Sequence, residues 1–363
     1  MSAVAAPGAV VTAVGAVTPV GCGVVETGAS IRAGIARLRV HPSYVPIQPE
    51  IPDGEPEPVR AAWVLDPGLG VGLRERLARL ALAALADLAA TSGLRRDECE
   101  GLPVAWALPE RGRDGIADVD AADLARDVAA RSGLALAFAG ACEDGHAAAH
   151  AALARALEQL AGGAPRCLVV AVDSQLDEDV LASLDAAYRL RSARNVDGYI
   201  PGEAAVALLV ERADAARARG AHAPVAIRGV ARGDEPSSSR SDAASTGAGL
   251  AEACRAALAG AALERARWVV CDLNGESHRA HEWGTVSTRL AAELASPAVW
   301  HPADCAGDVG AASGALGVAL VARAHARGYA PARDALVWCA SEGAARAAAI
   351  VGANEEAGPW ARP

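Results

Sequence analysis

The chain contains no lysine and a single phenylalanine, so all 34 of its basic residues are arginines. Its 44 acidic residues give a net charge of −10 at pH 7. An acidic chain is poorly suited to bind a phosphate backbone, so we expect no nucleic-acid partner. Aromatic residues make up 3% of the chain, which is too few for a base-stacking platform or for the core of a typical β-sandwich.

Signals for export and membrane insertion are also missing. No uncharged run approaches the roughly 18 apolar residues of a membrane span, and the first residues lack the basic and apolar regions of a secretory signal. We therefore expect a cytoplasmic protein. The eight cysteines form no Cys-x-x-Cys pair, which disfavours a zinc ribbon or a redox dithiol and favours reduced, buried thiols.

Metal and nucleotide motifs are weak. His146 and His150 have a spacing that can chelate a metal on one helix face, but no glutamate lies between them as in His-Glu-x-x-His, and a third ligand is not evident. The glycines at 68, 70 and 72 do not have the Gly-x-Gly-x-x-Gly spacing of a dinucleotide loop. The sequence therefore predicts no metal and no cofactor.

What the chain does have is 52% hydrophobic residues, arranged as alternating strand-like and helix-like segments. Strands are predicted at 9–17, 102–108, 134–139, 167–172, 204–210, 225–230, 268–273 and 335–340. Helices are predicted at 24–33, 74–90, 118–132, 146–160, 212–219, 249–263 and 311–326. Residues 41–72 are rich in proline and glycine and are expected to be irregular. Two blocks of alternating elements predict an α/β fold with helices on the faces of mixed sheets.

Cys142 has the most informative local context. An apolar strand, a Gly-Ala-Cys turn and a helical run predict that its sulfur lies at a helix N-terminus, where the dipole stabilises a thiolate. Glu143 and Asp144 follow directly, and a like charge about 4 Å away is worth about 4 kcal/mol against about 0.3–1 kcal/mol for the helix end. The local chemistry therefore leaves both a nucleophile and an inert thiol open.

Several segments together resemble the β-ketoacyl-[acyl-carrier-protein] synthases, the condensing enzymes of the thiolase fold. They are the opening strand and turn at 10–21, the Cys-Glu-Asp-Gly-His segment at 142–146, the Asp-Gly-Tyr-Ile-Pro-Gly-Glu-Ala-Ala segment at 197–205, and Ser-Asp at 241–242. The resemblance extends over about residues 8–350. It implies a five-layered α/β/α/β/α thiolase-like fold of two similar halves, residues 1–222 with Cys142 and residues 223–363.

The resemblance also assigns site residues, with departures from the family pattern. Cys142 falls on the nucleophile, while Asn274 and Asp308 stand where the family has its two catalytic histidines. Ala303 replaces the family's lysine, and Ser-Glu-Gly-Ala-Ala-Arg at 341–346 replaces a glycine-rich loop. The implied substrate-binding residues are Gly202, Glu203, Gly307 and Ser341.

These replacements predict that decarboxylative condensation is lost or severely impaired, although the Asn274 amide can still donate one hydrogen bond. Condensation forms an enolate whose oxyanion the two imidazoles would stabilise, and removing one such donor costs about 2.7–4 kcal/mol. An ionised Asp308 donates no hydrogen bond and repels the enolate, so its cost is larger. Acyl transfer onto Cys142 is less demanding, because it needs a thiolate and a backbone oxyanion hole but no enolate.

Three functions stay open. The chain is an acyl-thioester acyltransferase that uses Cys142, a non-catalytic scaffold or heterodimer partner with the ketosynthase fold, or a condensing enzyme in which a displaced histidine, such as His278 or His281, takes part. The resemblance implies an acyl carrier protein or acyl-CoA as a partner. It also implies a homodimer formed through an edge strand, for which residues 167–172 or a neighbouring strand are the candidate.

Two surface expectations complete the picture. The resemblance brings acidic groups at 272, 276, 304 and 308 to the mouth of one cavity. They could form an acid/base or cation site. We favour the alternative that the pocket is unused and has been refilled by ion pairs to Arg279 and Arg346. A carrier protein is generally acidic, so its docking would depend on a local arginine patch at 189, 191 and 194.

Overall fold

The computed structural model describes residues 4–46, 57–64, 71–193, 195–237 and 243–355. Its main feature is a ten-stranded ladder in the order β10-β9-β11-β12-β8-β1-β7-β6-β4-β5. The N-terminal half of the chain contributes five of these strands, which in sequence order are β1 (Val4–Val17), β4 (Leu102–Ala107), β5 (Leu136–Cys142), β6 (Arg166–Ser174) and β7 (Glu203–Arg212). The second five are β8 (Val225–Asp234), β9 (Ala266–Cys271), β10 (Leu294–Trp300), β11 (Asp334–Ala340) and β12 (Ala345–Ala353).

The two halves share one topology. Each set places its first strand in the middle of the ladder, followed outward by its fifth, fourth, second and third strands. The outer three strands of each half are parallel to one another, and the remaining pairings are antiparallel. The antiparallel pair β1–β8 joins the halves. The repeat is therefore evident in the structure, although the sequence carries no comparable internal repeat.

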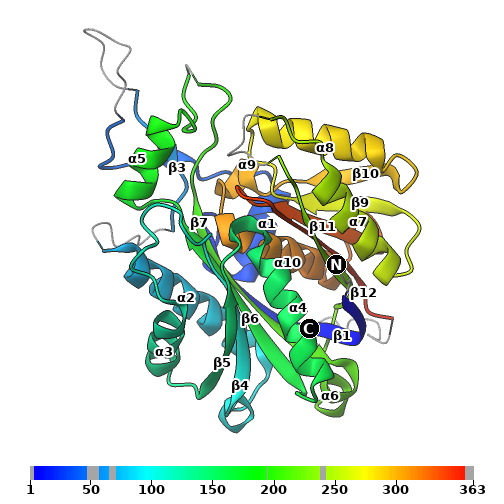
Figure 1. Ribbon diagram of the computed structural model, residues 1–363. Helices are drawn as coiled ribbons and strands as arrows, with labels where there is room; N and C mark the ends of the chain where they lie inside the picture. The colour runs from blue at the N-terminus through cyan, green and yellow to red at the C-terminus, as the bar shows by residue number, and fades with distance from the viewer. Residues whose placement is uncertain (1–3, 47–56, 65–70, 194, 238–242, 356–363) are drawn as a thin grey trace.

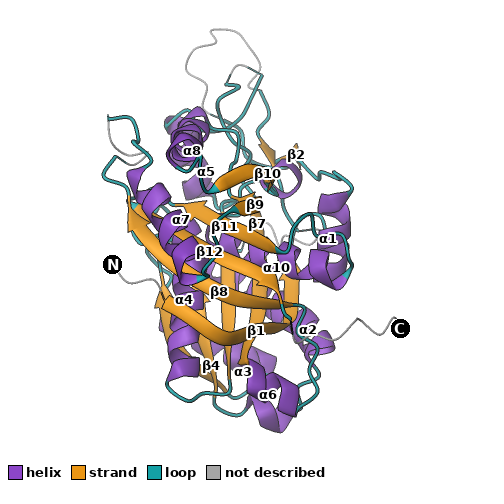
Figure 2. Ribbon diagram, turned by 90° about the vertical axis from the view of Figure 1, so that its right-hand side faces the viewer, coloured by secondary structure: helices purple, strands orange, loops and turns teal. Residues whose placement is uncertain are grey.

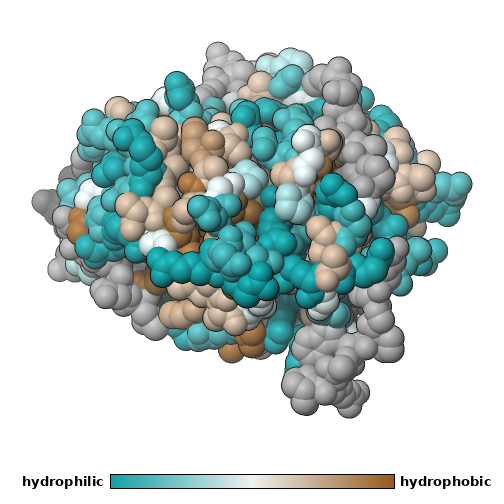
Figure 3. Space-filling view, turned by 90° about the horizontal axis from the view of Figure 1, so that it is seen from below, coloured by the Kyte–Doolittle hydropathy of each residue, from teal (hydrophilic) through white to brown (hydrophobic). Residues whose placement is uncertain are grey.

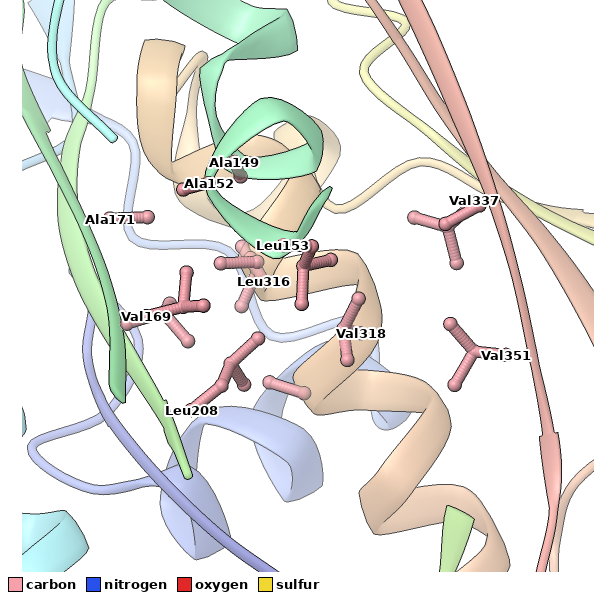
Figure 4. Packing of buried hydrophobic residues seen from close by; sticks show 14 of the residues in the cluster. Ala149, Ala152, Leu153, Val169, Ala171, Leu208, Leu316, Val318, Val337 and Val351 are labelled. Carbon is pink, nitrogen blue, oxygen red and sulfur yellow. The ribbon is translucent and has the colours of Figure 1, made fainter. Parts of the chain in front are cut away.

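Helices form the other three layers. α4 (Ala148–Ala161) and α10 (Ser313–Ala326) lie between the two half-sheets, where both helices bury small and aliphatic residues (Figure 4). α2 (Leu73–Ser92) and α3 (Ala121–Ser132) cover the outer face of the first half-sheet. α7 (Ala248–Gly260) and α8 (Ser277–Arg289) cover the outer face of the second (Figure 1). This arrangement confirms the predicted five-layered α/β/α/β/α fold.

Shorter elements lie at the periphery (Figure 2). They are α1 (Val24–Arg32), β2 (Arg39–Val40), β3 (Arg60–Ala61), α5 (Glu178–Ala186), α6 (Ala213–Ala218) and α9 (Ala303–Ala306). None of the described helices combines the length and hydropathy that a membrane span requires. Most predicted elements are present with ends shifted by a few residues.

Several element predictions were wrong. No element was predicted at residues 277–289, which form α8, and the strands β10 and β12 were not predicted. The candidate dimer strand at 167–172 belongs to β6, which has β4 on one side and β7 on the other. Its continuous apolar pattern reflects burial on both faces of the sheet. The edge of this half-sheet is β5, two strands further out.

Candidate functional site

The two central helices begin with equivalent turns that meet in the middle of the molecule. A 3₁₀ turn at Gly145–Ala147 precedes α4, and one at Gly310–Ala312 precedes α10. Gly145 and Gly310 have φ of 62° and 51°, and a Cβ on Gly310 would lie 2.0 Å from the Asp173 carboxylate. Glycine is required there because the backbone is left-handed and the space is filled. The residues beside these turns are thereby brought together.

Asp308 lies at the centre of this meeting point and is 3% exposed. Its Oδ1 accepts hydrogen bonds from Gln175 Nε2 at 2.9 Å and from the Gly310 N–H at 2.8 Å, and it lies 2.7 Å from His146 Nε2. Its Oδ2 accepts from Asn274 Nδ2 at 2.7 Å. Both carboxylate oxygens are therefore committed to partners within the protein.

Asp308 and His146 form a buried ion pair. Burial alone would raise the pKa of Asp308, but the neighbouring His146 and Arg279 and the Gly310 N–H hold it well below its usual range. Burial likewise opposes the charged form of His146, yet the attraction of Asp308 outweighs it and raises the pKa of His146. The sequence pointed to His146 as one half of a metal-chelating pair or, by the resemblance, as a residue that lines the dimer side or the cavity.

A ring of arginine–carboxylate pairs surrounds this ion pair. Arg279 donates to Glu342 Oε1 at 2.7 Å and to Asp272 Oδ2 at 3.2 Å. Arg189 forms two-pronged contacts with Glu276 and with Glu342. The expected refilling of the pocket by Arg279 is thus observed. Arg346 is instead buried against Glu282, with Nε 2.6 Å from Oε1.

The neighbour that influences the Cys142 thiol most is Arg155, not Asn274 or Asp308. It is the last residue of β5, and α4 begins only after the intervening turn, so the predicted place at a helix N-terminus is wrong. Burial raises the pKa of the thiol, which the nearby Arg155 only partly offsets. Asp144 and Glu143 are drawn to Arg232 and Arg111. Asp308 therefore contacts both His146 and Asn274, while the thiol lies beside Arg155.

Asn274 has no free amide hydrogen. Its Nδ2 donates to Glu276 Oε2 at 3.0 Å as well as to Asp308, and its Oδ1 accepts from the Glu276 N–H at 3.1 Å. It therefore serves as a link between two carboxylates.

The predicted substrate-binding residues take part in contacts between segments of the protein itself. Glu203 is fully buried and pairs with Arg76, and it also accepts from the Val64 N–H at 3.0 Å. Gly202 and Gly307 let two chain segments approach, since a Cβ on Gly202 would lie 2.6 Å from the Ala306 oxygen and one on Gly307 would lie 2.8 Å from the Ile200 oxygen. The Ser341 hydroxyl accepts from the Ala147 N–H at 2.9 Å.

The other histidines do not reach the cluster. His278 and His281 occupy exposed positions on α8, and His301 pairs with Asp304 at 2.8 Å on the surface. His150 contacts the Val337 carbonyl at 3.0 Å, not His146. Within the described part of the chain, no group of three His, Cys, Asp or Glu side chains is placed to hold a metal ion.

The arginines of the expected docking patch have different surroundings in the structure. Arg189 is committed to the buried ring described above, whereas Arg191 is exposed and donates to the Val196 carbonyl at 3.1 Å. Residue 194 lies outside the described residues.

A cavity of about 410 Å³ opens beside His146. It is lined by Glu110, Gly112, Arg113, Asp114, Gly145, His146, Asp173, Gln175, Val180, Ser183, Leu184, Arg189, Tyr199 and Glu342. None of the residues predicted for catalysis or substrate binding is among them. Residue spacing carries little signal for this lining, because its members come from six separate segments that only the folded chain brings together.

No family model and no curated protein matches the chain. Solved structures do. The ishigamide ketosynthase/chain length factor is similar with a TM-score of 0.77 and 19% identity, over 95% of this chain and 99% of that one. A type II polyketide ketosynthase in complex with its acyl-carrier protein gives 0.78 and 17%, over 95% and 99%.

A third similar structure is a ketosynthase in complex with its chain length factor from Xenorhabdus doucetiae. It gives a TM-score of 0.73 and 15% identity over 96% of this chain and 98% of that one. Identities this low establish the architecture alone. The chain has the thiolase-like fold of ketosynthases and chain length factors.

Proposed function

We propose that this protein is a non-catalytic ketosynthase-like subunit, which pairs through β5 with a second ketosynthase-fold chain. The observation that carries the proposal is the buried, ionised Asp308, fully hydrogen-bonded at the place where a condensing enzyme of this resemblance would need a hydrogen-bond donor.

Condensation is opposed by the absence of donors at the two positions that the resemblance makes catalytic. Asp308 is a carboxylate and only accepts, and both Nδ2 hydrogens of Asn274 point to carboxylates. An enolate placed there would meet negative charge without a compensating hydrogen bond. Since one missing oxyanion donor already costs about 2.7–4 kcal/mol, the loss at two positions removes effective catalysis.

Acyl transfer through Cys142 is opposed by the state of its thiol. The attacking species in such a reaction is the thiolate, and burial raises the pKa of Cys142 so that the thiol stays protonated at neutral pH. Its side chain is also 8% exposed, which leaves an acyl thioester little access.

Pairing is supported by the edge of the sheet. β5 contacts only β4 within the described ladder, and its Phe138 is 45% exposed. An apolar, unpaired edge strand is a template for a strand of another chain. Figure 3 shows apolar patches among hydrophilic residues on the face seen from below. The similar structures include a ketosynthase assembled with its chain length factor.

The catalytic part is tested by intact-mass spectrometry after incubation with acetyl-CoA, malonyl-CoA or an acyl carrier thioester. We expect no covalent adduct and no release of carbon dioxide. An adduct that is present in the wild-type chain and absent in Cys142→Ala would contradict the proposal and support the acyltransferase. Carbon dioxide release would support a condensing enzyme.

The pairing part is tested by sedimentation velocity of the purified chain, for which we expect a dimer formed with a second copy. Phe138→Glu introduces a charge on β5 and should shift the chain toward the monomer. Val25→Glu on α1 is the matched control, because Val25 is similarly exposed at 52% but lies away from β5. Equal behaviour of the two variants would contradict pairing through β5.

A further inference from the structure

The cavity beside His146 is not explained by a pairing subunit. It opens to solvent, with walls from the segment after β4, the start of α4, the end of β6, α5, the segment before β7 and the loop after β11. Half of its lining residues are ionisable, with four carboxylates, two arginines and His146. A cavity with this many charged groups is suited to a polar ligand.

Arg113 and His146, two side chains that can carry positive charge, line the cavity. Arg113 uses Nη1 for Asp173 Oδ1 at 2.8 Å and Nη2 for the Ser174 carbonyl at 3.1 Å. Each of these two nitrogens carries a second hydrogen, which these contacts leave for a ligand. His146 contacts Asp308 through Nε2, and the attraction of that carboxylate raises the pKa of His146, which favours the charged ring. Buried donors of positive charge favour carboxylate oxygens.

Carboxylate side chains also line the cavity. The Glu110 carboxylate is close to the backbone of Gly145 and Gly343, since a Cβ on Gly343 would lie 2.6 Å from Glu110 Oε1. Asp114 is exposed on the same segment, and Glu342 also lines the cavity but is paired with Arg189 and Arg279. This side of the cavity favours an ammonium group.

An apolar strip completes the lining. Val180 and Leu184 project from consecutive turns of α5, and both are buried. They pack in one cluster with Tyr199, whose hydroxyl donates to Gln175 Oε1 at 2.6 Å. This wall can cover an aliphatic or aromatic side chain.

We propose that the cavity binds a zwitterionic ligand of the amino-acid class, with its carboxylate toward Arg113 and His146 and its ammonium toward Glu110 and Asp114. The cavity volume lies within the range of small-molecule sites and suits an amino acid. A long acyl chain is a poor occupant, because it would strip water from the charged groups without replacing their hydrogen bonds.

The experiment titrates each standard amino acid into the purified chain, with thermal shift as the screen and calorimetry on the best ligand. We expect at least one to bind saturably. Its decarboxylated amine and its deaminated acid should each bind about tenfold more weakly or worse, since each lacks one charge-assisted interaction. Absence of saturable binding by every amino acid, or equal binding of the amine or the acid, overturns the proposal.

A pair of α5 variants places the site. Ser183→Trp fills the cavity from α5 and should abolish binding, while Ala182→Trp adds the same side chain at an exposed neighbour that does not line the cavity and should leave binding intact. Unchanged binding in Ser183→Trp overturns the site. The measurement uses the chain alone and is independent of whether β5 pairs with a partner.

Discussion

Asp308 and His146 are both buried, and their pKa values move in opposite directions because each stabilises the charge of the other. The lowered pKa of Asp308 contributes stability that is present above the unfolded-state value of about 3.9 and is lost as the pH falls through the folded-state value. The raised pKa of His146 contributes stability that is complete below about 6.5 and is lost as the pH rises through its folded-state value. The pair therefore stabilises the fold most between about pH 4 and 6.5.

Asp308→Asn should be strongly destabilising. It leaves the His146 cation beside Arg279 without its counter-charge, and breaking a buried pair in this way costs about 3–5 kcal/mol. Urea unfolding at pH 6 measures the loss. The double variant with His146→Gln should lose less than the sum of the two single variants, because it removes both charges. Strict additivity of the two would contradict a coupled pair.

His150 should make the fold sensitive to acid. Burial lowers its pKa to about 4, and its Nδ1 is buried without a partner among the described residues. Because the folded state disfavours the proton, stability is present above pH 6.5 and falls as the pH drops from about 6.5 to 4, by up to about 3 kcal/mol. Unfolding curves over this range should show a smaller pH-dependent loss in His150→Leu than in the wild type. Equal slopes would contradict a neutral, buried His150.

At the scale of elements, the approach of α4 and α10 depends on Gly314. A Cβ there would lie 2.7 Å from His150 Nδ1 and 3.0 Å from the Ala149 Cβ. Gly314→Ala should therefore destabilise the protein by about 1–3 kcal/mol through overpacking, even though alanine is the better helix former. Gly284→Ala in α8 is the matched control. Its Cβ meets nothing within 4 Å, so it should stabilise by about 0.5–1 kcal/mol. Thermal unfolding checks both, and the same sign in both would contradict the close contact.

Helices and strands were predictable from the sequence where one face of the element is buried, or where a long run of its residues is buried on both faces. The strands at 167–172 and 204–210 are continuous apolar segments, and Gly93 ends α2 in the left-handed conformation. β12 was missed because its alanine-rich segment has little strand propensity and owes its conformation to pairing with β8 and β11. α8 was missed because it buries few residues beneath a polar surface.

The candidate site was predictable only in part, for a related reason. The resemblance placed Asn274 and Asp308 in one region, and the structure brings them into contact at 2.7 Å. The direction of the Cys142 thiol and the contact of His146 with Asp308 depend on how the chain turns between β5 and α4. Packing against the turn at 310–312, far away in the sequence, determines that conformation. The cavity lining is likewise assembled from segments far apart in the chain.

At the scale of the whole molecule, the predicted boundary between residues 222 and 223 divides two halves that share their core. β1 pairs with both β7 and β8, so the ladder runs without interruption from one half to the other. The central cluster contains Leu153 and Val169 from one half together with Val318 and Val337 from the other (Figure 4). Neither half can bury its inner sheet face without the helix contributed by its counterpart.

The two halves should therefore unfold as one unit, although each has a complete topology of its own. Calorimetry should show a single transition whose calorimetric and van't Hoff enthalpies agree. Residues 223–363 expressed alone should show poor amide protection, because the face that packs on α4 and β1 would be exposed to water. Co-expression with residues 1–222 should restore the protection. Two resolved transitions, or a well-protected isolated half, would mean that the shared layer contributes little to the stability of either half.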